Sequence, residues 1–169
     1  MIELKDSPFW RYWTEDPDAS GDPAANFARH AEICRTYFSS LPESKAGYRY
    51  APGKWTVREV VGHLTDANLV FLYRLVCIAR GEQKPLPGFE ENDYVANAMF
   101  DSQPWRTVLD SYRGVSQAAL GLVAGIDAAA WERSGSANGV RMKSREMLWV
   151  LMGHERHHIR TLKERYGLA

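Results

Sequence analysis

The stretch SREMLWVLMGHERHHIRTLKERYG, residues 144–167, decides more of the expected fold than any other part of the chain. On a helical wheel at about 100° per residue, its apolar side chains gather on one side and its basic side chains lie opposite. His154 and His158 fall on the apolar side, one helical turn apart. Ser144 is the expected N-cap, and Gly167 is the expected terminator. The pattern predicts an amphipathic helix whose histidine-bearing face is turned toward a helical core.

Three other segments carry helix signals, and their expected bounds are about residues 23–40, 56–81 and 103–125. The first begins with Asp22 as N-cap, followed by a proline at the first helical position. The second opens with Thr56 and Glu59 in the spacing of a capping box and ends at Gly81. Ser102 is the expected cap of the third segment.

The connections between these helices predict how the chain is routed. Residues 81–101 contain two prolines and a glycine that exclude a continuous helix, although residues 90–100 are compatible with a short one. Residues 127–144 have the pattern of a helical turn followed by a Gly/Ser/Asn loop, and no strand pattern is evident. Four long helices predict an all-α fold, a four-helix bundle. The long connection favours a crossover between the second and third helices.

Composition and charge narrow the class of protein. The chain has 169 residues, of which 45% are hydrophobic and 25% are charged, as in ordinary soluble domains. We expect one domain over residues 1–169, with residues 1–21 as an N-terminal extension. Lys and Arg together number 21, as do Asp and Glu, and this balance argues against a nucleic-acid partner.

The sequence also bears on location. It contains no run of about 18 apolar residues, so no membrane partner is expected. Its first residues include acids and tryptophans where a signal peptide would have a basic and then an apolar run. Cys34 and Cys77 both lie within expected helices, which favours reduced thiols over a disulfide framework. We therefore expect a cytoplasmic protein.

Three histidines form a candidate metal site. His154 and His158 at i and i+4 can bind one ion, but the same spacing suits two core histidines bonded to backbone carbonyls. His63, on the buried face of the second helix, is a candidate third ligand. Three neutral imidazoles with an open fourth position are typical of a catalytic divalent metal. His30, without a comparable partner, is expected to be a surface or packing residue.

Residues 154–158 also match H-E-x-x-H, the pattern of zinc metalloproteases. The extended metzincin pattern requires Gly and His where this chain has Thr161 and Glu164, and no later helix remains to supply a ligand. The protease hypothesis is therefore rejected. Glu155 can still orient an imidazole or act as a catalytic base, although an interhelical salt bridge is the alternative interpretation.

Two stretches carry a family resemblance. KWTVREVVGHLTDAN (residues 54–68) and GHERHHIRTLKERYG (residues 153–167) resemble the DinB/YfiT-like superfamily, whose second helix carries a histidine and whose last helix carries an H-x-x-x-H pair. RGEQKPLPGFEENDYV (residues 80–95) is similar to the connector in one branch of that family. The resemblance extends over roughly residues 22–167 and says nothing of DNA contact.

The resemblance implies an up-down-down-up four-helix bundle that holds nickel or zinc through His63, His154 and His158. It also implies a homodimer, and an enzyme that joins low-molecular-weight thiols to electrophiles, isomerises small molecules or hydrolyses them. The ligands alone do not choose between thiol and water as the nucleophile.

Three hypotheses therefore remain: a metal-dependent thiol S-transferase, a metal-dependent hydrolase, and a non-catalytic protein that binds a metal or a small ligand. Asn92, Asp93 and Tyr94 in the long connector can form a lid over the pocket or serve as cap and packing residues. Arg74 can meet an anionic substrate, although an arginine near a helix end is usually solvated.

Overall fold

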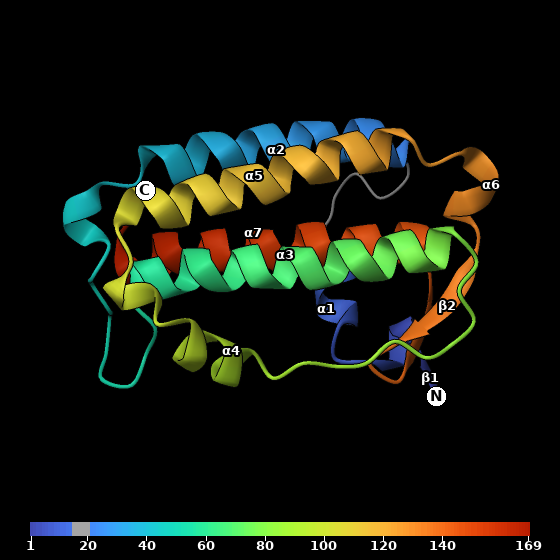
Figure 1. Cartoon of the computed structure of the whole chain (residues 1–169), viewed down its shortest axis with the longest axis horizontal. Coiled ribbons are helices and arrows are strands. Elements are labelled where there is room, and N and C mark those ends of the chain that lie inside the picture. Colours follow the sequence, from blue (N-terminus) through green and yellow to red (C-terminus); the bar gives the residue numbers. More distant parts are fainter. Residues whose placement is uncertain (15–20) are drawn as a thin grey trace.

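The computed structural model describes residues 1–14 and 21–169 of the chain (Figure 1). The helices are α1 (Trp10–Thr14), α2 (Pro23–Ser40), α3 (Val57–Ala79), α4 (Glu91–Ala98), α5 (Trp105–Ala124), α6 (Ala128–Trp131) and α7 (Ser144–Tyr166). The strands are β1 (Ile2–Glu3), β2 (Ser134–Ala137) and β3 (Val140–Lys143). Short 3-10 turns cover Leu4–Asp6, Glu43–Lys45 and Phe100–Ser102.

The four long helices α2, α3, α5 and α7 form a bundle (Figure 1). α2 and α3 each pack against both α5 and α7, so α2 and α3 lie at diagonally opposite corners. Followed by colour in Figure 1, α3 and α5 run in one direction along the bundle, and α2 and α7 run in the other. The segment between α3 and α5, which includes α4, returns along the bundle. The prediction of a mostly helical bundle is confirmed.

Local signals set the start of α2 and α3 as expected. The Asp22 carboxylate accepts a hydrogen bond from the backbone N–H of Ala25. At the start of α3, the Thr56 hydroxyl accepts from the Glu59 N–H, and the Glu59 carboxylate accepts from the Thr56 N–H. This reciprocal capping box satisfies two backbone N–H groups at the start of α3 and fixes where the helix begins.

The predicted caps Ser102 and Ser144 are wrong. α5 begins at Trp105 with Pro104 as its N-cap, because the residue before a proline is disfavoured in helical geometry and Gln103 is extended. Ser144 is already helical, and its hydroxyl donates to the carbonyl of Ala130 instead. At this end of α7 a glutamate three residues into the helix accepts from the Lys143 N–H.

The expectation of no strands is also wrong, since the chain forms a small sheet in the order β1-β3-β2. The sheet lies beside one end of the bundle (Figure 1). β2 and β3 form an antiparallel hairpin around Asn138 and Gly139, with φ of 50° and 75°. An Asn-Gly pair at positive φ is the favoured two-residue hairpin turn. β1 joins β3 in parallel, pairing Ile2 with Val140. Strands this short give too little alternation for the sequence to reveal them.

α3 is the most apolar of the long helices, and its burial explains why. An 18-residue window of α3 is apolar enough that, by length and composition alone, it would suit a membrane span. Of that window 67% is buried inside the bundle, as in the core helix of a helical protein. Cys34, on α2, and Cys77, on α3, are both free.

The N-terminal segment packs along α7 rather than away from the bundle. α1 packs against α7, where Gly153 lies directly beneath the backbone of Tyr12. A Cβ atom added at Gly153 would come within 2.0 Å of the Tyr12 carbonyl oxygen, so a glycine is required for this close approach. The predicted extension, residues 1–21, includes residues 15–20, which lie outside the described residues.

We predict that Gly153→Ala lowers the free energy of unfolding by about 1–3 kcal/mol, because backbone must shift to accommodate the new methyl group. Gly121→Ala is the matched control: it lies on exposed α5 surface with nothing within 4 Å of an added Cβ, and it should stabilise by up to about 1 kcal/mol. Urea denaturation of both variants measures the difference. Equal stabilisation by the two substitutions would contradict the close packing of α1 on α7.

Candidate metal centre

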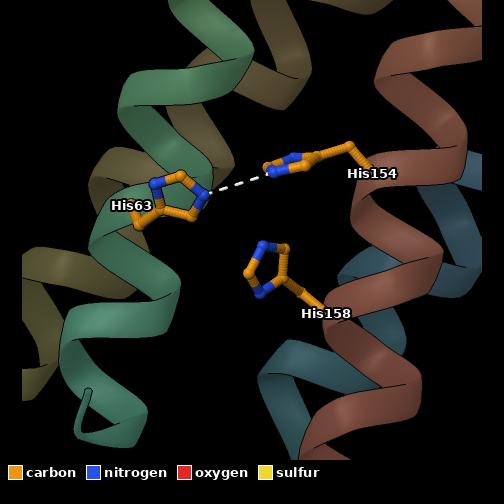
Figure 2. A group of neighbouring side chains, drawn as sticks. All are labelled: His63, His154 and His158. Atoms are coloured by element: carbon orange, nitrogen blue, oxygen red, sulfur yellow. Dashed lines mark hydrogen bonds between the residues drawn. The ribbon is translucent and has the colours of Figure 1, made fainter. Parts of the chain in front are cut away.

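Three histidines from two helices converge on one point, as Figure 2 shows: His63 projects from α3, and His154 and His158 project from α7. The Nε2 atoms of His63 and His154 are 3.2 Å apart. One nitrogen from each of the three rings lies within 4.8 Å of the others. His63 and His154 are buried, and His158 is half-buried. The structure thus brings together the three residues that the sequence predicts as metal ligands.

Burial keeps all three imidazoles neutral. Loss of solvent lowers the pKa of His63 from 6.5 to about 4. Burial also holds the pKa of His154 well below its ordinary range, with further lowering from the neighbouring His158 and His63. The pKa of His158 is depressed in the same way, by burial first and then by His63. Each ring therefore has a free lone pair at neutral pH, which is the form that binds metal ions.

This donor set fits a divalent metal ion. One N–H can join His63 to His154, but that hydrogen bond leaves the lone pair of His158 unused. Nδ1 of His154 is buried and has no hydrogen-bond partner among the described residues, so the ring is not held by a carbonyl through that atom. A cation among the three nitrogens would satisfy all three lone pairs at once. Imidazole ligands suit zinc, nickel, copper and iron.

Aromatic side chains surround the cluster on several sides. The Trp55 ring lies 4.7 Å from that of His63 and stacks on that of His158 at 6.5 Å, measured between centroids. Phe71 and Tyr12 meet the ring of His154 edge-on at 5.3 and 5.4 Å. These rings limit the access of water to the nitrogens. They leave the half-buried His158 as the point of contact with solvent.

A pocket of about 240 Å³ opens beside His158. It is lined by Tyr50, Gly53, Lys54, Trp55, Val60, Asn92, His158, Thr161 and Tyr166. Of the connector residues predicted as a lid, Asn92 on α4 belongs to this lining. Tyr94 instead packs its ring against Phe89 at 5.1 Å, as a packing residue does. One member of the predicted lid therefore reaches the pocket next to the histidines.

Glu155 faces away from the three histidines, into the centre of the bundle. Its Oε2 lies 2.7 Å from Nε2 of His30 on α2. Its Oε1 accepts hydrogen bonds from the Asn68 amide on α3 at 2.8 Å and from the Tyr112 hydroxyl on α5 at 2.5 Å. Four long helices thus meet at one carboxylate, in agreement with the interhelical alternative.

The surface alternative for His30 is wrong, because the side chain is only 3% exposed. Its apolar neighbours on α2 gave a signal: Phe27 and Cys34 lie one turn before and after it, on the same buried face. Burial by itself would raise the pKa of Glu155, but the hydrogen bond and positive charge of His30 and the bonds from Tyr112 and Asn68 hold it below its ordinary value. Glu155 is therefore a carboxylate at neutral pH.

Arg74 is not solvated, contrary to the usual behaviour of an arginine near a helix end. It is 4% exposed, and its Nη2 donates to the carbonyl of Pro87 at 2.6 Å. Its guanidinium lies 5.8 and 5.9 Å from the ring centroids of Phe71 and Phe89. These contacts attach the crossover segment to α3, and they are structural ones.

Comparison with known proteins gives both a family and a set of similar folds. A family model for the DinB superfamily matches residues 26–162. No curated protein matches the chain. YfiT from Bacillus subtilis, described as a probable metal-dependent hydrolase with an unusual four-helix bundle topology, has a TM-score of 0.73 at 17% identity, over 86% of this chain and 89% of that one.

Two further solved structures are similar. A mycothiol-dependent maleylpyruvate isomerase has a TM-score of 0.63 at 17% identity, over 94% of this chain and 62% of that one. A DinB-like protein from Bacillus cereus ATCC 10987 has a TM-score of 0.62 at 22% identity, over 86% of this chain and 91% of that one. At these identities the likeness establishes a shared fold.

We predict that the metal-free protein loses stability as the pH falls from 6.5 to about 4, the interval between the ordinary and the lowered pKa of His63. In this interval the unfolded chain binds a proton that the folded chain excludes, so the unfolding free energy falls by up to about 3 kcal/mol for this group. Urea denaturation across the interval measures the slope. His63→Gln should make the slope shallower, although His154 and His158 still contribute to it, and His157→Gln should leave it nearly unchanged. Equal slopes in the two variants would refute the assignment.

A second prediction concerns the central carboxylate. Glu155→Gln keeps the shape but places an amide where donors from three helices converge, and it should cost about 2–4 kcal/mol. Glu164→Gln, at an exposed position of the same helix, should change stability by less than about 0.5 kcal/mol. Thermal and urea unfolding of the two variants provide the comparison. A loss at position 155 no larger than that at position 164 would be inconsistent with the network.

Proposed function

Because the chain belongs to the DinB superfamily, we propose that it is a divalent-metal-dependent enzyme that activates a low-molecular-weight thiol for transfer to an electrophile. The observation that supports this most is the convergence of His63, His154 and His158 as neutral donors beside a pocket. We propose nickel or zinc as the metal. A homodimer and a cytoplasmic location remain predictions.

A divalent ion held by the three imidazoles would supply Lewis acidity, lowering the pKa of a thiol or a water molecule that reaches it. Because His63, His154 and His158 are all neutral, the ligands themselves offer no negative charge to balance a cation. A site of this kind favours an anionic fourth ligand, and a thiolate meets that need. The half-buried His158 marks the side from which such a ligand would approach.

The pocket beside His158 offers contacts for the rest of a thiol substrate. Trp55 is held in place because the Tyr166 hydroxyl donates to its backbone carbonyl at 2.7 Å. Its indole forms a flat apolar wall next to His63 and His158. Lys54, at the exposed rim, adds a positive charge that would attract an anionic tail. In this proposal the aromatic wall positions the substrate, and the lysine selects its charge.

We also propose that the helices follow the up-down-down-up order and that the crossover serves the site. α4 packs against α3 and brings Asn92 to the pocket wall. A direct hairpin between α3 and α5 would leave that wall without this residue. The crossover is thus assigned the role of a partial lid, with Asn92 as its substrate-facing side chain.

A hydrolase is the second candidate, supported by the description of YfiT as a probable metal-dependent hydrolase. The thiol alternative is supported by the mycothiol dependence of the similar isomerase. A third candidate is a binding protein that holds a metal or small ligand without turnover. The three candidate functions predict different turnover of thiols and esters, so one panel of thiol and ester substrates distinguishes them.

We expect untagged protein to be purified with nickel or zinc, and His63→Ala to weaken metal affinity by more than about tenfold. His157→Ala is the matched control, since its ring lies on α7 but outside the cluster, and it should retain the metal. Elemental analysis and metal titration measure both. Metal-loaded protein should accelerate the reaction of small thiols with a chromogenic aryl halide, and His63→Ala should abolish the acceleration.

Different results would favour the other candidates. Turnover of esters without acceleration of thiol addition would identify a hydrolase. Metal binding without turnover on either panel would indicate a binding protein. Metal content unchanged in His63→Ala would remove this residue from the site and contradict the proposal at its basis.

A further inference from the structure

A second group of potential metal ligands lies within the bundle, on the other side of α7 from the three histidines. His30 and Cys34 are one turn apart on α2, and Glu155 reaches them from α7. Nε2 of His30 is 2.7 Å from Oε2 of Glu155 and 3.3 Å from Sγ of Cys34. Sγ of Cys34 is 3.8 Å from the same carboxylate oxygen. All three side chains are buried.

We propose that His30, Cys34 and Glu155 form a second metal site, suited to a thiophilic divalent cation such as Zn²⁺. Ligands bound tetrahedrally at about 2.0–2.3 Å from one zinc ion stand roughly 3.3–3.8 Å from each other. The two distances from Cys34 already lie in this range. The distance of 2.7 Å between His30 and Glu155 is below it, so these two side chains would have to separate by roughly half an ångström or a little more to hold the ion. Nitrogen, sulfur and carboxylate oxygen are the three atom types that zinc accepts in proteins.

The neighbours of Glu155 support this assignment, because Tyr112 and Asn68 hold one oxygen and leave the other directed at His30 and Cys34. Tyr112 and Asn68 both donate to Oε1, whereas Oε2 faces His30 and Cys34. Carboxylates that bind metals are usually oriented by hydrogen bonds of this kind. The same Tyr112 and Asn68 contacts fix Glu155 relative to α3 and α5, so the site would be formed before an ion arrives.

Charge balance distinguishes this cluster from the three histidines. A thiolate from Cys34 and the carboxylate of Glu155 would neutralise a divalent cation within the core, and His30 would add a neutral nitrogen. Without a cation, burial and the nearby Glu155 charge hold the pKa of the Cys34 thiol well above its ordinary value. Metal binding would therefore release the Cys34 thiol proton to solvent, and Nε2 of His30 would have to give up any proton that it carries before it could bind the ion.

A pocket of about 350 Å³ between α2 and α7 connects this cluster with the surface. His30 and Cys34 both contribute to its lining. Its lining also carries three basic residues and one acid: Arg156, Arg160, Lys163 and Glu164. This excess of positive charge would slow a free cation but admit a metal bound to an anionic chelator. The cluster thus has an access route that does not pass the three histidines.

Cobalt titration of the metal-free full chain tests the proposal, since a cysteine thiolate bound to Co²⁺ gives a near-ultraviolet charge-transfer band that imidazole ligands do not. His63→Ala, which disables the histidine cluster, should still bind one equivalent of Co²⁺ with this band and release at least one proton per ion. Cys34→Ser should lose the band and bind one equivalent fewer than the wild type. Cys77→Ser, which changes the other free cysteine, should keep it.

The proposal is overturned if His63→Ala shows no thiolate band, or if the band persists in Cys34→Ser or disappears in Cys77→Ser. Circular dichroism checks that each variant is folded. Should Cys34→Ser fail to fold, His30→Gln replaces it, because the glutamine amide can still donate to Glu155 but the imidazole ligand is gone. The Co²⁺ affinity measured from the thiolate band must then fall by at least about tenfold. The thiolate band of His63→Ala reports on the second site alone, because the histidine cluster is disabled in this variant. Failure of the second-site proposal is therefore distinguishable from failure of the thiol-transfer proposal.

Discussion

The fold depends on one buried carboxylate. Glu155 of α7 receives hydrogen bonds from α2 through His30, from α3 through Asn68 and from α5 through Tyr112, so each of the four long helices contributes to one point in the core. A buried carboxylate without such partners would cost several kcal/mol, and therefore the helices can take only rotations that keep all of these bonds. Once α7 is held in that rotation, His154 must face α3, where His63 lies.

α7 thus separates two groups of potential metal ligands within one bundle. On one side, three neutral imidazoles adjoin a pocket and bring no negative charge of their own, which suits a cation that exchanges an anionic ligand. On the other side, Cys34 and Glu155 can supply two negative charges in a buried setting, which suits a cation held permanently. Adjacent residues of one helix, His154 and Glu155, belong to the two sides because each residue turns the helix by about 100°.

Much of this arrangement could be predicted from local sequence. The capping box at Thr56 and the helical spacing of His154 and His158 are properties of single helices, and the structure contains both. Features that depend on a partner element could not be found in this way. The sequence around Ser144 is typical of an N-cap, and only the folded structure shows that its hydroxyl donates to Ala130 instead. The role of His30 likewise depends on α7, which places Glu155 beside it. The Asn138–Gly139 pair is typical of a hairpin turn, but the strands beside it are too short to be predicted from an alternating pattern.

We propose that His63, His154 and His158 hold a divalent metal ion in the native protein. Anomalous diffraction from crystals of untagged protein, collected on both sides of the nickel and zinc absorption edges, tests it most directly. We expect an anomalous peak about 2.0–2.2 Å from one nitrogen of each of the three rings. A map with no anomalous signal there, and with His63 and His154 joined by an ordinary hydrogen bond in metal-supplemented crystals, would contradict it.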